Sequence, residues 1–221
     1  MKIVSHTICK NSHPFIGAVL KAALPIVDRM IITISKKSND GTREVIESLQ
    51  SPKIELYEEE VSNMGELTIE RQKQIDMTAK GDIIWFLDDD DFWEEDQVRG
   101  AIEYLINSDI DAISVNPYQI LDKEHEDANW IKKKYFSKFF KNVDINYRGA
   151  WPRDLIYKGN ELLYHKSNPR NQTVPYKFWH LATVKGYSFR KNDLLSFNDL
   201  EGRPIKLETK LPEEITNLLD I

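Results

Sequence analysis

The chain has 221 residues, of which 41% are hydrophobic and 10% aromatic, as is typical of one folded domain and not of a disordered or fibrous chain. Its 30 Lys and Arg against 36 Asp and Glu give a formal charge of −6, so the overall charge gives no reason to expect a nucleic-acid partner. The single cysteine excludes an internal disulfide and a multi-cysteine zinc site.

The first half of the chain alternates apolar runs with helical patterns. Strands are expected over the apolar runs at residues 2–7, 29–34, 54–57, 82–87 and 112–115. Helices are expected between these strands. Three start near Ser12, Thr42 and Glu66, and a fourth covers 98–106. Four such alternations predict a parallel sheet covered by helices. Because ligands bind beyond the carboxyl ends of parallel strands, the loops after Thr7, Ser35, Tyr57 and Leu87 should share one rim.

The second half is less regular and shows no internal repeat or Gly/Ser linker. Residues 117–150 are polar and rich in lysine and aromatic residues. Short apolar runs at 155–157, 162–164 and 178–184 predict strands or loops added to the same domain, and Pro212 opens a short helical pattern.

Neither a membrane span nor an export signal is predicted. The longest nearly apolar stretch, 15–27, contains Lys21 and Pro25 and is too short to cross a bilayer. Polar residues among the first eleven positions interrupt any signal-peptide core. We therefore expect a cytoplasmic protein with no transmembrane segment.

Four consecutive aspartates, 88–91, directly follow the most hydrophobic predicted strand. Crowded carboxylates repel one another unless cations or hydrogen-bond donors offset them, and oxygen ligands of this kind suit Mg²⁺ or Mn²⁺. The alternative is a solvated acidic turn that caps the next helix. A calcium hand is excluded because its sixth and twelfth positions would be Trp93 and Arg99, and no glycine-rich phosphate loop is present.

Four motifs in this order resemble the nucleotide-sugar-binding half of inverting family 2 glycosyltransferases with the GT-A fold. They are TICKN (7–11), SNDGT (38–42), the pair ERQ (70–72) and KGD (80–82), and FLDDDDFW (86–93). The last is similar to the family's metal-binding D-x-D segment. The resemblance implies an α/β fold of the GT-A type, with a mostly parallel, Rossmann-like sheet flanked by helices and a smaller irregular acceptor-side region.

The resemblance also implies roles for the acidic loop. Asp88 and Asp90 would form the D-x-D pair, with Asp90 on Mn²⁺ or Mg²⁺ and Asp88 on the metal or the ribose. Asp89 would lie near the nucleotide. Arg71 would either approach the diphosphate or brace the aspartate loop as an ion pair.

The same resemblance places the nucleotide against the first two strand ends. The residues implied are Thr7, Asn11, Ser35, Asp40 and Thr42. The sequence departs from the family at 35–37, which read Ser-Lys-Lys where the family usually has two aspartates before a Gly-Ser pair. The carboxylate expected beside the base is therefore absent or supplied by 58–60, although a UDP-sugar remains the family's usual donor.

The acceptor side offers fewer signals. His180 is the third predicted metal ligand, with His165 weaker, and a satisfied structural histidine is the alternative. Inverting transfer needs a general base, for which we select Asp154, with Glu161 second; a salt bridge between Asp154 and Arg153 is the alternative.

Residues 131–153 carry a local charge of +6 and interleave their cations with aromatic residues. This pattern suits a polyanionic acceptor such as nucleic acid, a phosphorylated glycan or a lipid-phosphate surface. The alternative is an amphipathic helix with aromatic residues packed inward and solvated lysines.

We therefore predict a metal-dependent glycosyltransferase that moves a sugar from a nucleoside-diphosphate sugar to an acceptor hydroxyl. Residues 1–116 would form the nucleotide-sugar-binding half, 117–190 the acceptor-binding and catalytic half, and 191–221 a tail with a short helix. Two alternatives remain: a metal- or nucleotide-sugar-binding module without catalysis, and a nucleotidyltransferase, which would normally show a glycine-rich amino-terminal loop.

Overall fold

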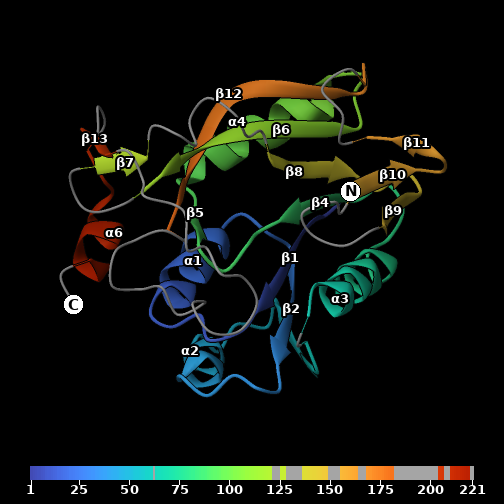
Figure 1. Cartoon of the computed structure of the whole chain (residues 1–221). Helices are drawn as coiled ribbons and strands as arrows, with labels where there is room; N and C mark the ends of the chain where they lie inside the picture. The colour runs from blue at the N-terminus through green and yellow to red at the C-terminus, as the bar shows by residue number, and fades with distance from the viewer. Residues whose placement is uncertain are drawn as a thin grey trace.

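The computed structural model describes residues 1–61, 63–120, 125–127, 136–148, 155–163, 168–181, 204–206 and 210–219. An eight-stranded sheet with the order β3-β2-β1-β4-β8-β6-β12-β5 forms its centre (Figure 1). Its first four strands are parallel neighbours: β3 (Ile54–Glu59), β2 (Arg29–Ser35), β1 (Ile3–Cys9) and β4 (Ile83–Phe86). The alternating strands and helices predicted for the first half are thus confirmed.

The other half of the sheet mixes directions. The antiparallel strand β8 (Phe136–Lys141) lies between β4 and β6 (Ala112–Gln119). Next to β6 runs the parallel strand β12 (Asn171–His180), and the short β5 (Asp91–Phe92) pairs antiparallel with the end of β12. Residues from beyond position 135 are therefore part of the same sheet as the amino-terminal strands.

Helices cover both faces of this sheet. One face packs against α1 (Phe15–Ala23), α2 (Thr42–Ser48) and α4 (Glu95–Asn107), whose buried apolar residues share one core with β1, β2 and β4. Helix α2 follows Gly41, whose φ of 91° lies in the left-handed region that glycine adopts without strain. Acidic residues in the first turn of α4 favour that helix terminus.

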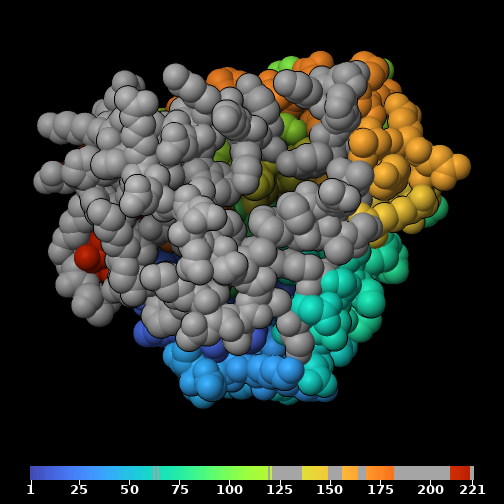
Figure 2. Space-filling view, viewed as in Figure 1, coloured from blue at the N-terminus to red at the C-terminus, as the bar shows by residue number. Residues whose placement is uncertain are grey.

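The opposite face packs against α3 (Met64–Asp76) and a three-stranded sheet made of β9 (Ile145–Arg148), β10 (Leu155–Lys158) and β11 (Glu161–Leu162). Figure 2 shows the surface of α3 beside that of this small sheet. The side chain of Asn63 caps α3 by accepting from the backbone N–H of Glu66 at 3.0 Å.

The remaining elements, β7 (His125–Asp127), β13 (Pro204–Lys206) and α6 (Glu213–Leu218), lie near the carboxyl terminus in space (Figure 1). Strands β7 and β13 pair with each other, and α6 packs on a second core with Phe15 and Trp179. Pro212 precedes α6 as predicted. Among the described residues, none of the helices has the length and apolarity needed to cross a membrane.

Within the stretch 131–153 the structure describes residues 136–148. The amphipathic helix is wrong, because 136–141 and 145–148 are strands. The described cations of this stretch also bind within the chain: Lys138 contacts aspartates, Lys141 donates to the carbonyl of Ser108, and Arg148 donates to that of Gly159. These three side chains therefore offer no support for a nucleic-acid surface.

One buried histidine in β1 gives a prediction about stability. His6 is fully buried, and its Nε2 lies 2.7 Å from Oγ1 of Thr78. Burial, reinforced by the charges of Arg71 and Arg29, holds the pKa of His6 well below its ordinary value. Below about pH 6.5 the unfolded chain binds a proton that the folded chain does not. The free energy of unfolding should therefore decrease as the pH is lowered below this value.

We expect wild type to lose up to about 1.4 kcal/mol per pH unit below pH 6.5 relative to His6→Gln, until the pH reaches the folded pKa. Above pH 6.5 the difference between the two proteins should be constant. Urea unfolding of both proteins between pH 5.0 and 7.5 measures this. Parallel stability curves below pH 6.5 would contradict the assignment of His6 as a buried neutral histidine.

Candidate metal and nucleotide site

Four loops at the carboxyl ends of the parallel strands meet at one rim, as predicted. Ser12, after β1, donates through its backbone N–H to Oγ1 of Thr42 at 2.7 Å and through its hydroxyl to Asp89. The hydroxyl of Ser35 donates to the carbonyl of Val61 at 3.1 Å, which ties the loop after β2 to the loop after β3. The rim is therefore one hydrogen-bonded unit.

The residues predicted to lie beside the base mostly build this rim. Asp40 accepts from the hydroxyl of Thr42 at 2.6 Å and from the backbone N–H of His13 at 2.9 Å. Asn11 accepts from the backbone N–H of Asn39 at 3.0 Å and has a φ of 51°. Thr7 is fully buried and donates to the carbonyl of Leu87 at 2.8 Å, so it positions the start of the aspartate loop.

Arg71 and Lys138 both bind Asp88. Arg71 donates to one carboxylate oxygen of Asp88 at 3.0 Å and to the carbonyl of His6 at 2.9 Å, while its guanidinium lies 4.6 Å from the centre of the Phe86 ring. Lys138 donates to the other oxygen at 2.6 Å. Desolvation would raise the pKa of Asp88, but Lys138 and Arg71 outweigh it and hold that pKa well below its ordinary value. Of the two roles proposed for Arg71, this geometry favours bracing.

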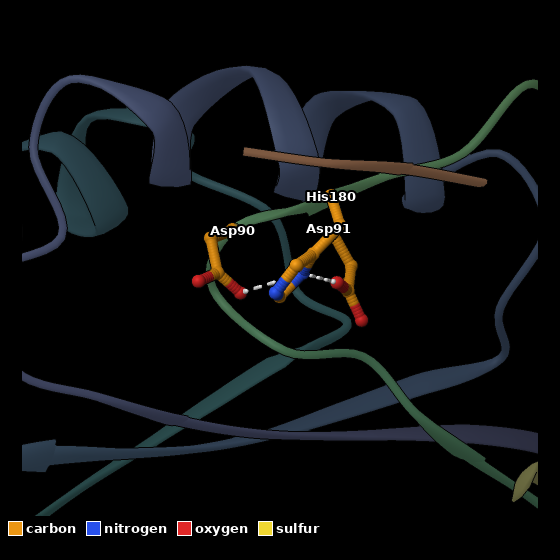
Figure 3. Close-up of side chains that lie close together, drawn as sticks. All are labelled: Asp90, Asp91 and His180. Carbon is orange, nitrogen blue, oxygen red and sulfur yellow. Dashed lines mark hydrogen bonds and ion pairs between the residues drawn. The ribbon is translucent and has the colours of Figure 1, made fainter. Parts of the chain in front are cut away.

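Asp90, Asp91 and His180 form a separate cluster, shown in Figure 3 with the imidazole between the two carboxylates. Nδ1 of His180 lies 2.7 Å from Oδ1 of Asp91 and 3.7 Å from Oδ1 of Asp90. Desolvation lowers the pKa of His180, but Asp90 and Asp91 outweigh it and raise that pKa. Strands β12 and β5 bring the cluster together, because His180 of β12 and Asp91 of β5 are direct cross-strand partners.

This cluster fits a divalent cation by the chemistry of its donors. One ligand atom from each of Asp90, Asp91 and His180 lies within 4.8 Å of the others, and the two carboxylates are buried. Carboxylate oxygens suit Mg²⁺ and Mn²⁺, and imidazole is a common ligand of first-row metals. Of the predicted ligands, Asp90 and His180 are thus neighbours, whereas both oxygens of Asp88 accept from cations outside the cluster.

Two residues of this site were not singled out from the sequence. Asp91 belongs to the aspartate run but was given no role, and Lys138 was counted only within a basic patch. A lysine enclosed by aromatic residues in FSKFFK (136–141) is a signal of a buried cation that needs carboxylate partners. The predicted base Asp154 and the weaker candidate His165 lie outside the described residues. Glu161, the second choice of base, is exposed in β11 and accepts from Asn168.

Solved structures with similar folds include two of S. aureus TarS (residues 1–349). One has a TM-score of 0.55 at 14% identity and covers 81% of this chain and 60% of that chain. The other, in complex with UDP-GlcNAc, has a TM-score of 0.55 at 12% identity and covers 81% and 58%. This chain therefore spans less than two thirds of those structures, and the likeness establishes a shared GT-A fold.

A weaker similarity, with a TM-score of 0.43 at 17% identity, is to glucosyl-3-phosphoglycerate synthase from Mycobacterium tuberculosis in complex with Mn²⁺, UDP and phosphoglyceric acid; it covers 52% of this chain and 43% of that chain. No curated protein sequence matches the chain significantly. Residues 6–160, more than half of the chain, match the family model described as Glycosyl transferase family 2. The chain therefore belongs to glycosyl transferase family 2.

Proposed function

We propose that the chain is a metal-dependent, inverting glycosyltransferase that moves a sugar from a nucleoside-diphosphate sugar to an acceptor hydroxyl. The observation that carries the proposal is the cluster of Asp90, Asp91 and His180 on the rim of a family 2 chain. Open α/β sheets bind their ligands at this edge. A buried set of two carboxylates and one imidazole there is suited to a divalent cation.

In this proposal Asp90 and His180 hold Mn²⁺ or Mg²⁺, which when bound would neutralise charge on the departing diphosphate. Asp88, whose side chain is 40% exposed, and Asp89 would lie on the nucleotide side of the same loop in this proposal. Asn11, Ser35, Asp40 and Thr42 hold the neighbouring loops in place, as their hydrogen bonds indicate. In this proposal the hydrogen-bonded rim would fix where the nucleotide lies relative to the aspartate loop.

Transfer with inversion requires the acceptor oxygen to attack the anomeric carbon while the bond from that carbon to the diphosphate oxygen breaks. The acceptor proton must pass to a general base during this step. Asp154 remains our proposed base. A sugar hydroxyl on a glycan or on a lipid-linked acceptor is the substrate class that we propose. Among the described cations of 131–153, Lys138, Lys141 and Arg148 bind within the chain and give no support for a nucleic-acid acceptor.

A uridine diphosphate sugar is the proposed donor. Solved complexes of the structurally similar TarS contain UDP or UDP-GlcNAc, which makes uridine donors the first to test. The loop after β2, which would lie beside the nucleotide base, carries Lys36 and Lys37. Both are exposed, and Lys37 forms an ion pair with Glu60 at 3.5 Å. Because these two lysines stand where the family usually has aspartates, the test must include other nucleotides.

A panel of UDP-, GDP-, dTDP- and CMP-sugars, each with Mn²⁺ and with EDTA, tests the proposal by thermal unfolding. At a hundred times the dissociation constant, the correct donor should raise Tm by about 5–10 °C with Mn²⁺ and much less with EDTA. Release of the free nucleotide, which is a nucleoside diphosphate from the first three donors and CMP from the last, then separates an enzyme from a binding module. A Tm that no donor changes would contradict the proposal.

A further inference from the structure

Lys138 occupies an irregular position in the sheet. Ile113 and Ser114 are adjacent in β6, yet they pair with Phe139 and Ser137 of β8, so Lys138 is the extra residue of a β-bulge. Such bulges interrupt the alternation of side chains and re-aim one of them, often next to a functional site. The last pair between β4 and β8 is Trp85 with Phe139, the residue that follows Lys138 in the sequence. Lys138 therefore lies next to the end of β4, where the chain enters the aspartate loop.

The bulge directs a lysine into the protein. Lys138 is only 3% exposed, and its ammonium lies 5.5 Å from the centre of the Phe136 ring and 5.1 Å from that of Phe178. It donates to Asp88 at 2.6 Å and also to Asp91. A lysine is almost never buried unless it is paired, so its two aspartate partners hold it at this position.

Asp91 connects this lysine to the cluster. The side chain is fully buried; one oxygen accepts from Lys138, and the other lies 2.7 Å from Nδ1 of His180. Lys138 thus contacts Asp91, Asp91 contacts His180, and His180 lies beside Asp90. Carboxylates that orient a ligating histidine through its ring nitrogen are a common feature of metal sites.

We propose that Lys138 is a positioning residue of the metal site: it fixes Asp91, and Asp91 fixes the imidazole of His180 beside the carboxylate of Asp90. Asp91 is then a supporting carboxylate, while Asp90 and His180 face the ion. The inference rests on the proposed function, because it assumes that this cluster binds a divalent cation.

An opposite role for Lys138 must be weighed, since a fixed cation repels Mn²⁺. Removing its charge would by itself lessen the repulsion of the ion, but it would also take the shared ammonium donor from Asp88 and Asp91. The fully buried Asp91 thereby loses its ammonium partner, and breaking a buried ion pair in this way is strongly destabilising. The aspartate loop must then move, and the imidazole of His180 moves with it. Loss of position therefore outweighs relief of repulsion.

The test is the affinity for Mn²⁺ alone, measured by titration calorimetry and by the electron paramagnetic resonance of free Mn²⁺. We expect Lys138→Met to bind Mn²⁺ at least about tenfold more weakly than wild type. The matched control is Lys141→Met on the same strand, whose ammonium donates to Ser108 at 2.7 Å, away from the aspartates. The control should bind like wild type. Equal or tighter binding by Lys138→Met, with wild type binding normally, overturns this inference alone; absence of binding by wild type overturns the proposed function as well.

A second comparison keeps the inference testable if Lys138→Met does not fold. Asp91→Asn removes the buried charge and should itself weaken Mn²⁺ binding about tenfold. If Lys138 acts through Asp91, adding Lys138→Met to Asp91→Asn should cause no further loss, as in a double-mutant cycle of two residues that act as one unit. A further tenfold loss in the double variant overturns the inference.

The imidazole provides a readout that a purely structural lysine would not change. In the metal-free protein, the ¹⁵N chemical shifts of the His180 ring report its hydrogen bond at Nδ1 and are assigned from their loss in His180→Gln. Lys138→Met should alter these shifts, and Lys141→Met should not. Unaltered His180 shifts in folded Lys138→Met would overturn the proposed sequence of contacts.

Discussion

Replacement of Asp90 by asparagine is expected to lower Mn²⁺-dependent sugar transfer at least about a hundredfold while the chain remains folded. Asp90 is 6% exposed, lies 3.7 Å from His180, and is the predicted metal ligand of the D-x-D pair. Asparagine keeps the shape of the side chain, and the backbone carbonyl that accepts from Leu181 at 2.9 Å is unchanged. The loss would therefore reflect one missing negative charge at the proposed site of the cation.

Two measurements separate this effect from misfolding. The Tm of the metal-free variant should stay close to that of wild type, because asparagine relieves repulsion between neighbouring carboxylates but gives up the attraction between Asp90 and His180. The rise in Tm on adding Mn²⁺ should disappear. Asp109→Asn is the matched control, since Asp109 is 97% exposed and its only described ion pair is with Arg170 at 3.4 Å. An Asp90→Asn protein that binds Mn²⁺ as tightly as wild type would show that the ion lies elsewhere.

The rim of this site was predictable because it follows from local order. Alternating apolar runs and helical patterns require parallel strands, and parallel strands place their carboxyl ends together. Ser12, Thr42 and Asp89 are distant in sequence but meet for this reason. The family motifs then predicted that the acidic loop binds a metal, and this prediction needed no knowledge of long-range contacts.

The individual roles within the acidic loop could not be read from four identical residues. Asp88 accepts from Arg71 and Lys138, whereas Asp91 lies opposite His180 because β5 pairs with the end of β12. A register between strands almost ninety residues apart leaves no local pattern in the sequence. The spacing therefore predicted a carboxylate site but not which carboxylate meets the histidine.

The helix predicted within 131–153 was wrong for a related reason. Neighbouring lysines at 132–134 make the whole segment look like a charged surface, although FSKFFK alone has the aromatic residues favoured in strands. Its place between β4 and β6 is set by tertiary pairing, and the bulge at Lys138 is visible only in that pairing. Net charge in a window does not separate a buried, paired lysine from solvated ones.

The largest effect on stability is expected at Trp85, in the centre of β4. Its side chain is fully buried, stacks on Phe139 with ring centres 5.6 Å apart, and meets the edge of Trp93 at 5.8 Å. Trp85→Ala should lower the free energy of unfolding by about 3–5 kcal/mol, because the neighbouring rings cannot fill the cavity. Urea unfolding, analysed with a common m-value, measures this difference. Ile69→Ala is the control, because Ile69 is 56% exposed on α3 and should change stability by less than about 0.5 kcal/mol.

A second substitution at the same position separates packing from polarity. Among the described residues, the indole N–H of Trp85 has no hydrogen-bond acceptor, although it is buried. Trp85→Phe removes that unsatisfied donor, whose burial costs about 1–3 kcal/mol, and retains an aromatic ring against Phe139. It should therefore destabilise far less than Trp85→Ala. Equal losses for the two variants would mean that the N–H group has an acceptor and that the polar contact, not ring packing, holds β4 beneath the aspartate loop.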